Sequence, residues 1–421
     1  MFDIKGGVMR YILHSDLNNF YASVECMLNP SIRNKAVVVV GDVEKRHGIV
    51  LAKNYIAKGY GVKTGDTVWE AKNKCPVELA TVPTHFDMYS KISKMVKDIY
   101  REYSDRVESF GIDEAWIDIT DRVHNFQEAE NLANTIRLRV LDEIGVTVSI
   151  GVSFNKVFAK LGSDYKKPNA VTVIRPDNFK DIVWGLPCED LIMVGRQTKA
   201  KLNKNNIFTI GDIAIAGRPF LKRLLGKNGE SIYEYASGLD SSEVRQSSES
   251  AEIKSVGNST TCPRDLTKDA EVKSVIYILA ENVARRMRAN HLWCNEVSLT
   301  IKNSKLESID RQKKLEYPTN LASDIAKVAY DIFKAEYDWS DTVRLVGVRA
   351  SGICDEPAQY NFLIDENTIS KKQKLEETVE TLRQRYGYKV ITRACIKGDV
   401  DLSDIDPTET RFSIHPESFS K

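Results

Sequence analysis

Apolar and polar residues alternate along two runs in the first half of the chain, residues 107–112 and 115–120. A period of two is typical of β-strands with one buried face, so these runs predict a β-hairpin. Asp113 and Glu114 stand at its bend. A further strand-like run, residues 11–16, also ends in an acid. The pattern therefore predicts three carboxylates at the ends of strands.

Helical periodicity lies between these strands. Apolar residues recur at helical spacing over residues 88–103 and again over residues 129–144, and another strand is predicted over residues 146–151. Apart from a long excursion over residues 20–83, the order is β-α-β-β-α-β, that of the ferredoxin-like split βαβ fold. In that topology the first strand and the central hairpin can be neighbours. The three acids can then meet, although the first is far from the others in the sequence.

The pattern changes to short helices over residues 175–245. Within them, residues 191–202 are typical of a degenerate helix-hairpin-helix, which points backbone amides and a helix N-terminus at a nucleic-acid phosphate. The usual two-glycine turn keeps only Gly195, with Met193 at the other place. We expect Gly195 and Thr198 to lie at a DNA backbone.

A polar stretch, residues 240–250, predicts a flexible linker and a domain boundary. Beyond it the β-α-β-β-α-β order recurs over residues 255–350, without obvious sequence similarity to the first unit. Residues 371–386 predict a basic amphipathic helix, and the chain then ends in a polar tail that we expect to be mobile.

Size and composition are those of an ordinary globular protein, with 421 residues, 42% hydrophobic and 28% charged. This length predicts two to four domains. The net charge of +1 gives no global sign of nucleic-acid binding, and no apolar run approaches a membrane span. Seven scattered cysteines without a CxxC pair predict reduced thiols in a cytoplasmic protein and argue against structural zinc.

The three acids carry the candidate chemistry. An acidic turn alone is most often just solvated, but three hard oxygen ligands on a ferredoxin-like sheet suit Mg²⁺ and suggest nucleotidyl transfer. Two Mg²⁺ ions about 3.5–4 Å apart would activate a 3′-hydroxyl and neutralise the leaving pyrophosphate. Asp16 and Asp113 would bridge both ions, and Glu114 would complete the primer-side ion. The carbonyl of Leu17 would serve the triphosphate-side ion, and Mn²⁺ is a candidate substitute.

Four segments carry a family resemblance: residues 16–25 (DLNNFYASVE), 54–58 (NYIAK), 111–114 (GIDE) and 167–169 (KPN). In order and spacing they resemble the Y-family translesion DNA polymerases, most closely the bacterial polymerase IV/V (DinB/UmuC) type. The likeness covers roughly residues 9–362. It implies an α+β multidomain fold: a ferredoxin-like palm with inserted fingers, a helix-hairpin-helix thumb and a βαββαβ little finger.

The resemblance also implies domain bounds. They are palm 1–19 and 84–174, fingers 20–83, thumb 175–245, linker 246–252, little finger 253–362 and a C-terminal extension 363–421.

The resemblance implies roles residue by residue. Asp16, Asp113 and Glu114 fall at the metal ligands. Tyr21 falls at the steric gate, where an aromatic ring under the sugar rejects a 2′-hydroxyl, with Phe20 packed beside it. The residues at the triphosphate contacts are Tyr55, Lys58 and Lys167.

Four positions depart from the family pattern. Lys58 stands where the family usually has arginine, which exchanges a bidentate fork for a point charge. Ala52 replaces a phosphate-binding hydroxyl, and Leu51 sits where the roof over the nascent base is often smaller. Gly111 replaces the usual serine.

The implied partners are primer–template DNA and dNTPs, with no membrane, and a monomer is expected. Gln359, Phe362 and Leu363 resemble a bacterial sliding-clamp peptide, in which an apolar pair is buried in a pocket. Two alternatives remain open: a polymerase relative that binds DNA without catalysis, and a nucleotidyl cyclase on a similar sheet.

Overall fold

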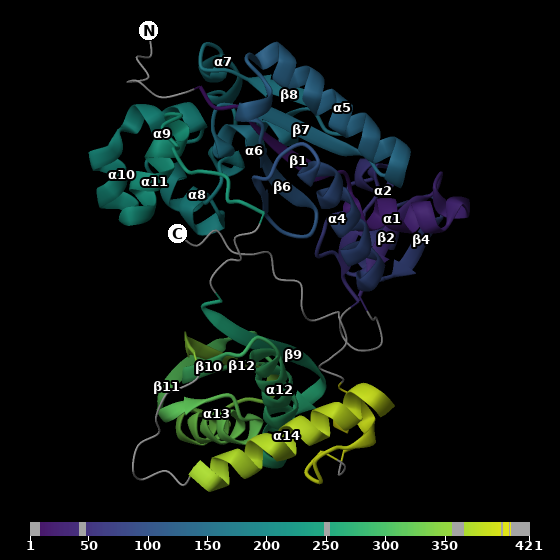
Figure 1. The fold of residues 1–421 in the computed structure, drawn as a ribbon, viewed down its shortest axis with the longest axis vertical. Helices are drawn as coiled ribbons and strands as arrows, with labels where there is room; N and C mark the ends of the chain where they lie inside the picture. The colour runs from purple at the N-terminus through teal and green to yellow at the C-terminus, as the bar shows by residue number, and fades with distance from the viewer. Residues whose placement is uncertain are drawn as a thin grey trace. The chain divides into compact units, whose positions relative to one another are not determined.

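The computed structural model describes residues 9–41, 48–247, 253–355, 366–396, 399–403 and 405. The chain divides into two compact units (Figure 1), one built from residues 9–40 and 50–247 and the other from residues 41, 48–49 and the described residues between 253 and 405. Within the described ranges, none of the helices offers the length of apolar sequence that crossing a membrane requires.

The centre of the first unit is a five-stranded sheet with the order β5-β6-β1-β7-β8. Its strands are β1 (Ile12–Leu17), β5 (Val107–Ser109), β6 (Glu114–Asp118), β7 (Val148–Ser153) and β8 (Val171–Ile174). β1 lies between β6 and β7 and runs antiparallel to both. This is the strand order of the split βαβ fold, and it confirms that the first strand and the hairpin are neighbours.

The hairpin turn is wider than the alternation predicts, since β5 ends at Ser109 and not at residue 112. Helix α4 (Phe86–Arg101) explains the difference. Its Lys97 donates to the carbonyl of Gly111 at 2.7 Å, and its Ser93 hydroxyl donates to the carbonyl of Ile112. Because side chains bond these carbonyls, strand pairing stops before them. Gly111 has a φ of 109°, a conformation that favours glycine.

Alternation along β1 and β6 gives the sheet two different faces. Leu13 and Leu17 belong to the core beneath α4 and α5 (Phe126–Ile144). Ile12 and Trp116 lie on the opposite face, which α6 (Lys156–Tyr165) covers. Since side chains alternate along a strand, Asp16 belongs to the face of Ile12 and α6.

The excursion after β1 forms a small sheet with the order β3-β2-β4. Its elements are β2 (Ala36–Val40), β3 (Val50–Lys53), β4 (Leu79–Pro83), α1 (Phe20–Leu28), η1 (Pro30–Ile32), α2 (Tyr55–Gly59) and α3 (Val68–Lys74). Asn54 joins α2 to β2, because its side-chain oxygen accepts from the amides of Val37 and Ala57. The same side chain therefore caps the helix and fixes it to the sheet.

Short helices follow β8, as the sequence predicted. They are α7 (Phe179–Val183), η3 (Cys188–Asp190), α8 (Arg196–Asn203), α9 (Ile210–Ala216), α10 (Arg218–Leu225) and α11 (Lys227–Ala236). The remaining short 3₁₀ turn of this unit, η2 (Thr120–Arg122), follows β6. Val157, Phe158 and Leu161 of α6 share one core with the helical segment, which fixes it to the large sheet.

Residues 240–247 are not the free linker that their composition predicts. Arg10 donates to the carbonyl of Ser242 at 2.8 Å, and the amide of Arg245 donates to the Glu108 carboxylate at 3.0 Å. The predicted flexibility is wrong for these residues because their backbone polar groups find partners beside β5, whereas the predicted domain boundary agrees with the division of the chain into its two units. Such partners are not visible in a local run of serines and acids.

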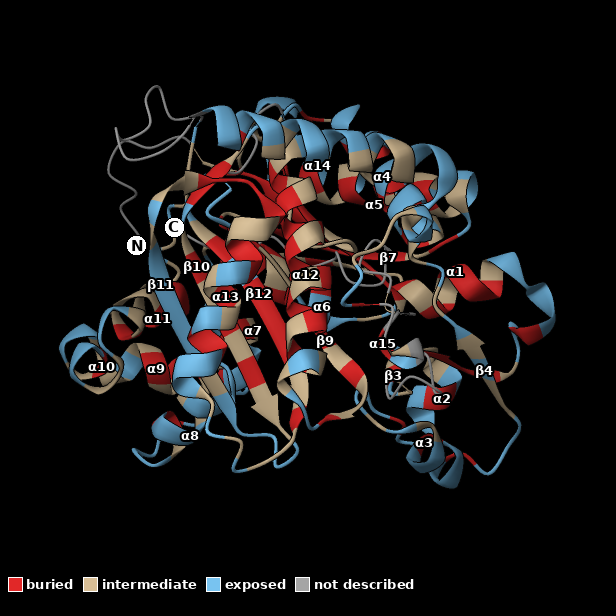
Figure 2. Cartoon of the chain, turned by 90° about the horizontal axis from the view of Figure 1, so that it is seen from below, coloured by how far each residue is buried: buried red, intermediate tan, exposed pale blue. Residues whose placement is uncertain are grey.

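The second unit repeats the predicted order of elements but not the strand order of the first. Its elements are β9 (Ser255–Leu266), α12 (Asp269–Ala289), β10 (Trp293–Asn303), β11 (Ser308–Thr319), α13 (Ala322–Glu336) and β12 (Val343–Cys354). The sheet order is β11-β10-β12-β9, so the first strand lies at an edge. Figure 2 shows buried positions on β12 and on the neighbouring α12 and α13.

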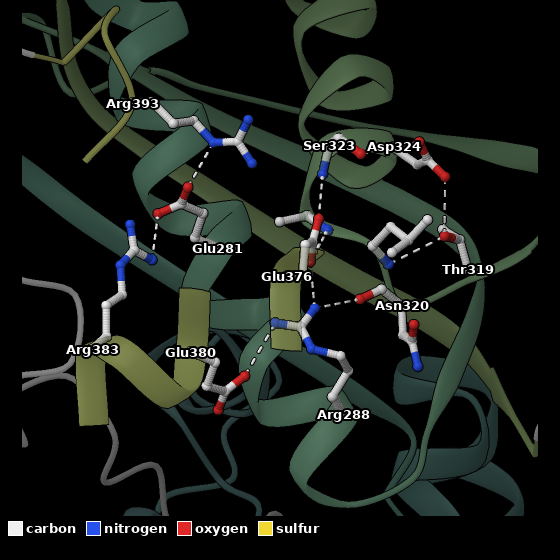
Figure 3. A network of polar contacts seen from close by, with 12 residues as sticks. Glu281, Arg288, Thr319, Asn320, Ser323, Asp324, Glu376, Glu380, Arg383 and Arg393 are labelled. Atoms are coloured by element: carbon white, nitrogen blue, oxygen red, sulfur yellow. Dashed lines mark hydrogen bonds and ion pairs between the residues drawn. The ribbon is translucent and has the colours of Figure 1, made fainter. Parts of the chain in front are cut away.

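Helix α14 (Glu366–Tyr386) lies against α12 and α13 of the second unit. Figure 3 shows its Glu376 between Arg288 and the start of α13. The Glu376 carboxylate pairs with Arg288 and accepts from the amide of Ala322 at 3.0 Å. α13 has no side-chain cap of its own, so a residue of another helix caps it.

The tail beyond α14 is only partly as expected. It includes η4 (Tyr388–Val390) and α15 (Val400–Ser403), and the side chains of Ile396 and Leu402 are buried. These two apolar residues anchor a stretch whose overall composition is polar, so the expected mobility does not hold for it. The clamp-like peptide (Gln359, Phe362, Leu363) lies outside the described residues.

Glu376→Ala should loosen the second unit, because it leaves Arg288 with one acid fewer and uncaps α13. We expect a local loss of about 3 kcal/mol, equivalent to roughly 100-fold faster amide exchange in the first turn of α13. Hydrogen exchange of the full chain, read by mass spectrometry, measures this. The exposed neighbour Glu377→Ala is the matched control, and equal exchange in both variants would contradict the capping role.

Candidate active site

β1 and β6 bring two of the predicted acids together. In their antiparallel register Asp16 stands opposite Glu114. The backbone amide of Leu17 donates to the carbonyl of Asp113 at 3.0 Å, so Asp113, the third acid, lies next to this pair. The three carboxylates therefore lie at neighbouring strand ends.

A cavity of about 540 Å³ opens beside these strand ends. Its walls come from β1, the start of α1, β3 and the turn before β6. Three of the departures from the family pattern, Leu51, Ala52 and Gly111, lie in its wall, whereas Tyr55 and Lys58 are not among the lining residues. The predicted site residues that line it are Asp16, Leu17, Phe20, Tyr21, Asp113, Glu114 and Lys167.

Two lysines neutralise two of the acids. Lys167 Nζ lies 2.7 Å from Asp16 Oδ2, and Lys160 Nζ lies 2.6 Å from Glu114 Oε2. His14 is fully buried on β1, and its Nε2 lies 3.5 Å from the same Glu114 oxygen. Burial, followed by the charge of Lys160, lowers the pKa of His14 well below its usual value, so the ring is neutral.

Negative charge is nevertheless left in excess. Burial raises the pKa of Asp16 to about 6, against the opposing effect of Lys167. Burial and then repulsion from Asp16 and Glu114 raise the pKa of Asp113 to about 6. Lys167 responds to the same field: burial lowers its pKa, but the Asp16 and Asp164 carboxylates raise it overall. The strand ends thus form a strong site for added positive charge.

The donor set suits a hard divalent cation such as Mg²⁺, because its ligands are carboxylate oxygens with uncompensated charge. In the part of the chain that the structure describes, no three acidic, histidine or cysteine side chains are grouped closely enough to hold a metal ion. The reason is visible in the contacts of Lys160 and Lys167, which take up Glu114 and Asp16. Binding a cation at Asp16 would exchange its Lys167 contact for a metal contact.

Tyr21 forms part of the cavity wall on an aromatic cluster. Its ring stacks on Tyr89 with centroids 4.3 Å apart and an interplanar angle of 11°, and Phe86 meets it edge-on at 5.7 Å. The Tyr89 hydroxyl in turn donates to the buried Glu25 carboxylate. Phe20 is buried beside Tyr21, at 5.6 Å between centroids. This packing restricts the Tyr21 ring to one side of the cavity.

Basic side chains stand near the cavity wall on the side of the small sheet. Lys53 and Thr64 line the cavity and contact each other at 3.0 Å. The Lys58 ammonium lies 5.6 Å from the centroid of the Tyr55 ring, and the Tyr55 hydroxyl reaches the Asn18 side chain at 3.4 Å. Burial and then the neighbouring Lys58 charge lower the pKa of Lys53. Lys53 and Lys58 thus form a positive rim that suits a polyphosphate.

Comparison with known proteins places the chain in a family. Residues 15–164 match the model of the impB/mucB/samB family, and residues 253–362 match the model of its C-terminal domain. The DNA polymerase IV of Acetivibrio thermocellus is 48% identical over 398 residues, covering 94% of this chain and 100% of that protein. The DNA polymerase IV 1 of Bacillus subtilis is 36% identical over 389 residues, covering 92% and 93%.

Solved structures agree with this placement. A Y-family DNA polymerase chimera, Dbh-Dpo4(243-245)-Dbh, matches with a TM-score of 0.74 and 25% identity, covering 82% of this chain and 100% of that one. DinB from Sulfolobus solfataricus matches with a TM-score of 0.56 and 26% identity over the same shares. The chain belongs to the Y family of DNA polymerases. The resemblance to the DNA polymerase IV type is thereby confirmed, and so is the palm, fingers, thumb and little-finger fold.

Other predicted positions of this Y-family polymerase lie away from the cavity wall. Gly195 precedes the first turn of α8, in which Thr198 lies, and Met193 has a φ of 70° at the place of the missing glycine. The first arm of the helix-hairpin-helix is only the 3₁₀ turn η3. Asp118, the last residue of β6, accepts hydrogen bonds from the amide and hydroxyl of Thr120.

Sequence reasoning missed several residues of the site. His14 showed no ligand spacing, yet its ring contacts Glu114. Lys160 and Lys53 belong to no sequence motif, and Tyr89 shows only the spacing of an amphipathic helix. Each of them meets its partner across the fold, so a single sequence gives only helical or strand spacing as a signal.

Removing one acid should stabilise the metal-free enzyme. A carboxyl whose folded pKa of about 6 exceeds its unfolded value near 3.8 destabilises the fold as pH rises through this interval. Asp113→Asn should therefore raise the stability of the first unit by about 1–2 kcal/mol at pH 8, and the gain should vanish below about pH 4. Scanning calorimetry in EDTA measures this as a Tm increase of roughly 2–8 °C.

The exposed acid Asp121 supplies the control for this test, because Asp121→Asn removes a charge away from the cavity. Its Tm should match that of the unmodified protein at both pH values. A Tm of Asp113→Asn that is unchanged or lower at pH 8 would show that the charge at the strand ends is already balanced.

Proposed function

We propose that this translesion DNA polymerase adds deoxynucleotides to a primer 3′-hydroxyl with Asp16, Asp113 and Glu114 at the reacting groups. The observation that carries the proposal is the register of β1 and β6, which sets Asp16 opposite Glu114 beside the cavity. Asp113 adds a third carboxylate with an elevated pKa. Carboxylates at a pocket with a basic rim suit metal-assisted transfer on a phosphate-bearing substrate.

The proposed cofactor is a pair of Mg²⁺ ions, with Mn²⁺ as a substitute. Bound there, they would lower the pKa of the attacking 3′-hydroxyl and neutralise the leaving pyrophosphate. Asp16 and Asp113 would hold both ions, Glu114 the ion at the primer, and the carbonyl of Leu17 the ion at the triphosphate. The high pKa values of the two aspartates support this assignment, since a dication restores the balance of charge.

The chain's own residues would position the nucleotide. Lys167, already in the cavity wall, carries a full positive charge that can move from Asp16 to a phosphate oxygen. Tyr55 and Lys58 would meet the triphosphate from the small sheet, and we add Lys53, which lines the cavity. The Tyr21 ring would lie beneath the sugar and leave no room for a 2′-hydroxyl.

The proposed partners are primer–template DNA and dNTPs. The amide end of α8, with Gly195 and Thr198, would contact the DNA backbone, as helix N-termini commonly bind phosphate. The sliding clamp, bound through Gln359, Phe362 and Leu363, remains a proposal, as do the monomeric state and the domain bounds given above. The free cysteines support a place in the cytoplasm.

Primer extension tests the function. Asp16→Ala and Asp113→Ala should each reduce Mg²⁺-dependent extension of a primed template at least about 1,000-fold, because each would remove a ligand shared by both ions. The exposed Asp142→Ala on α5 should extend at the normal rate. Primer extension that persists in both active-site variants would contradict the mechanism. DNA binding without extension in any metal would instead favour the inactive relative, and a cyclic product from ATP without DNA the cyclase.

Sugar selection tests Tyr21 separately. Tyr21→Ala removes the ring beside the sugar, so the preference for dNTP over rNTP should fall roughly 10- to 200-fold. Single-nucleotide competition between dNTP and rNTP measures the preference. Tyr60→Ala removes an exposed aromatic ring from the same small-sheet region and should leave the preference unchanged. Equal discrimination in Tyr21→Ala and the unmodified enzyme would remove Tyr21 from this role.

A further inference from the structure

Glu114 contacts a lysine, Lys160, to which none of the roles above is assigned. Lys160 Nζ lies 2.6 Å from Glu114 Oε2, and its side chain is 19% exposed. The second contact of Glu114, with His14 Nε2 at 3.5 Å, uses the same oxygen. Lys160 is not among the residues that line the cavity. It therefore touches the acid and not the space that a nucleotide would fill.

The position of Lys160 follows from a close approach between α6 and the sheet. A Cβ atom at Gly151 of β7 would lie 1.9 Å from the carbonyl oxygen of Ala159 and 2.5 Å from the amide of Ser163. Only glycine permits this distance. The helix is thereby pressed against β7 and β1. Lys160, which follows Ala159, then reaches Glu114 at the start of β6.

The preceding turn of the same helix fixes its rotation. Lys156 precedes Lys160 by four residues and so lies on the same face of α6. Its ammonium is buried, lies 2.6 Å from Glu108 of β5 and stands 4.5 Å from the centroid of the Trp116 ring. The Trp116 indole donates to the carbonyl of Lys156 at 2.9 Å. α6 cannot turn without breaking these buried contacts, so Lys160 is held at Glu114.

Lys160 and Lys167 differ in what they can do. Lys167 lines the cavity and divides its charge between Asp16 and Asp164, both at 2.7 Å, so it can exchange partners. Among the residues that the structure describes, Lys160 forms an ion pair with Glu114 alone, and its Nζ also lies 5.1 Å from the centroid of the Phe110 ring. Lys167 therefore suits a substrate contact, whereas Lys160 suits a fixed support.

We propose that Lys160 is a positioning residue that holds Glu114 by Oε2 and so presents the rest of its carboxylate to the metal-binding cavity. The proposal rests on the proposed function of Glu114 as a metal ligand. Outer contacts of this kind orient metal-binding carboxylates, and their loss typically lowers metal affinity or activity by about 10- to 100-fold. His14 alone is a poor substitute, because its Nε2 lies 3.5 Å from this oxygen, whereas Lys160 Nζ lies at 2.6 Å.

The alternative is that Lys160 is only a counter-charge, and the two roles predict opposite signs. Removing a positive charge near a cation site weakens repulsion, so a mere counter-charge would bind metal more tightly once lost. Removing a support frees the Glu114 carboxylate to turn, so metal would bind more weakly. The direction of the change therefore distinguishes them.

The test is Mn²⁺ binding to the full chain without DNA or nucleotide, followed by the EPR signal of free Mn²⁺. Lys160→Met should weaken binding about 10-fold or more. Lys160→Arg, which keeps a donor and a charge, should restore most of the affinity. In a Glu114→Gln background, Lys160→Met should have little further effect, because the support has no carboxylate left to hold.

Lys166→Met is the matched control, since it removes an exposed charge just beyond the end of the same helix. It should bind Mn²⁺ as the unmodified protein does. Unchanged or tighter binding in Lys160→Met, or an effect that simply adds to that of Glu114→Gln, would overturn the proposal. If the unmodified chain extends primers and Lys160→Met binds Mn²⁺ normally, only this inference fails. If it extends none, the proposed function fails, whatever the binding result.

Discussion

The burial of three carboxylates at neighbouring strand ends, together with the repulsion among them, is the constraint on which the first unit depends. Asp16 and Asp113 have pKa values raised to about 6, so ionising both at neutral pH costs folding free energy. The fold reduces this cost with two positive charges, namely Lys167 at Asp16 and Lys160 at Glu114. The residual charge is what would attract a divalent cation. The instability of the free site and its affinity for metal are thus two aspects of one arrangement.

Much of the fold could be predicted because its elements obey local periodicity. β1, α4, α5 and the second β-α-β-β-α-β unit all show it, and their order restricted the topology to a split βαβ sheet in the first unit. The errors lie where non-local partners decide. Residues 240–247 look like a linker but bond to the sheet edge, and the polar tail is anchored by Ile396 and Leu402.

The residues of the site also divide into those that could be predicted from the sequence and those that could not. The acids could be predicted because topology brings strand ends together, and Tyr21 because a resemblance marked it. Lys160 could not be predicted, because its role needs the glycine contact between α6 and β7 that brings a helix residue to another strand's acid. A lysine four residues after another is, in sequence, an ordinary helix face.

Strand order explains why only the first unit can join acids in this way. In the first unit the opening strand β1 lies between the hairpin strand β6 and β7, so an acid at its end meets an acid of the hairpin. In the second unit the opening strand β9 is at the sheet edge and pairs with β12, while the hairpin of β10 and β11 lies on the other side of β12. An acid at the end of β9 would be separated from that hairpin by an entire strand. Two units with one order of elements along the chain therefore differ in the chemistry that their sheets can assemble.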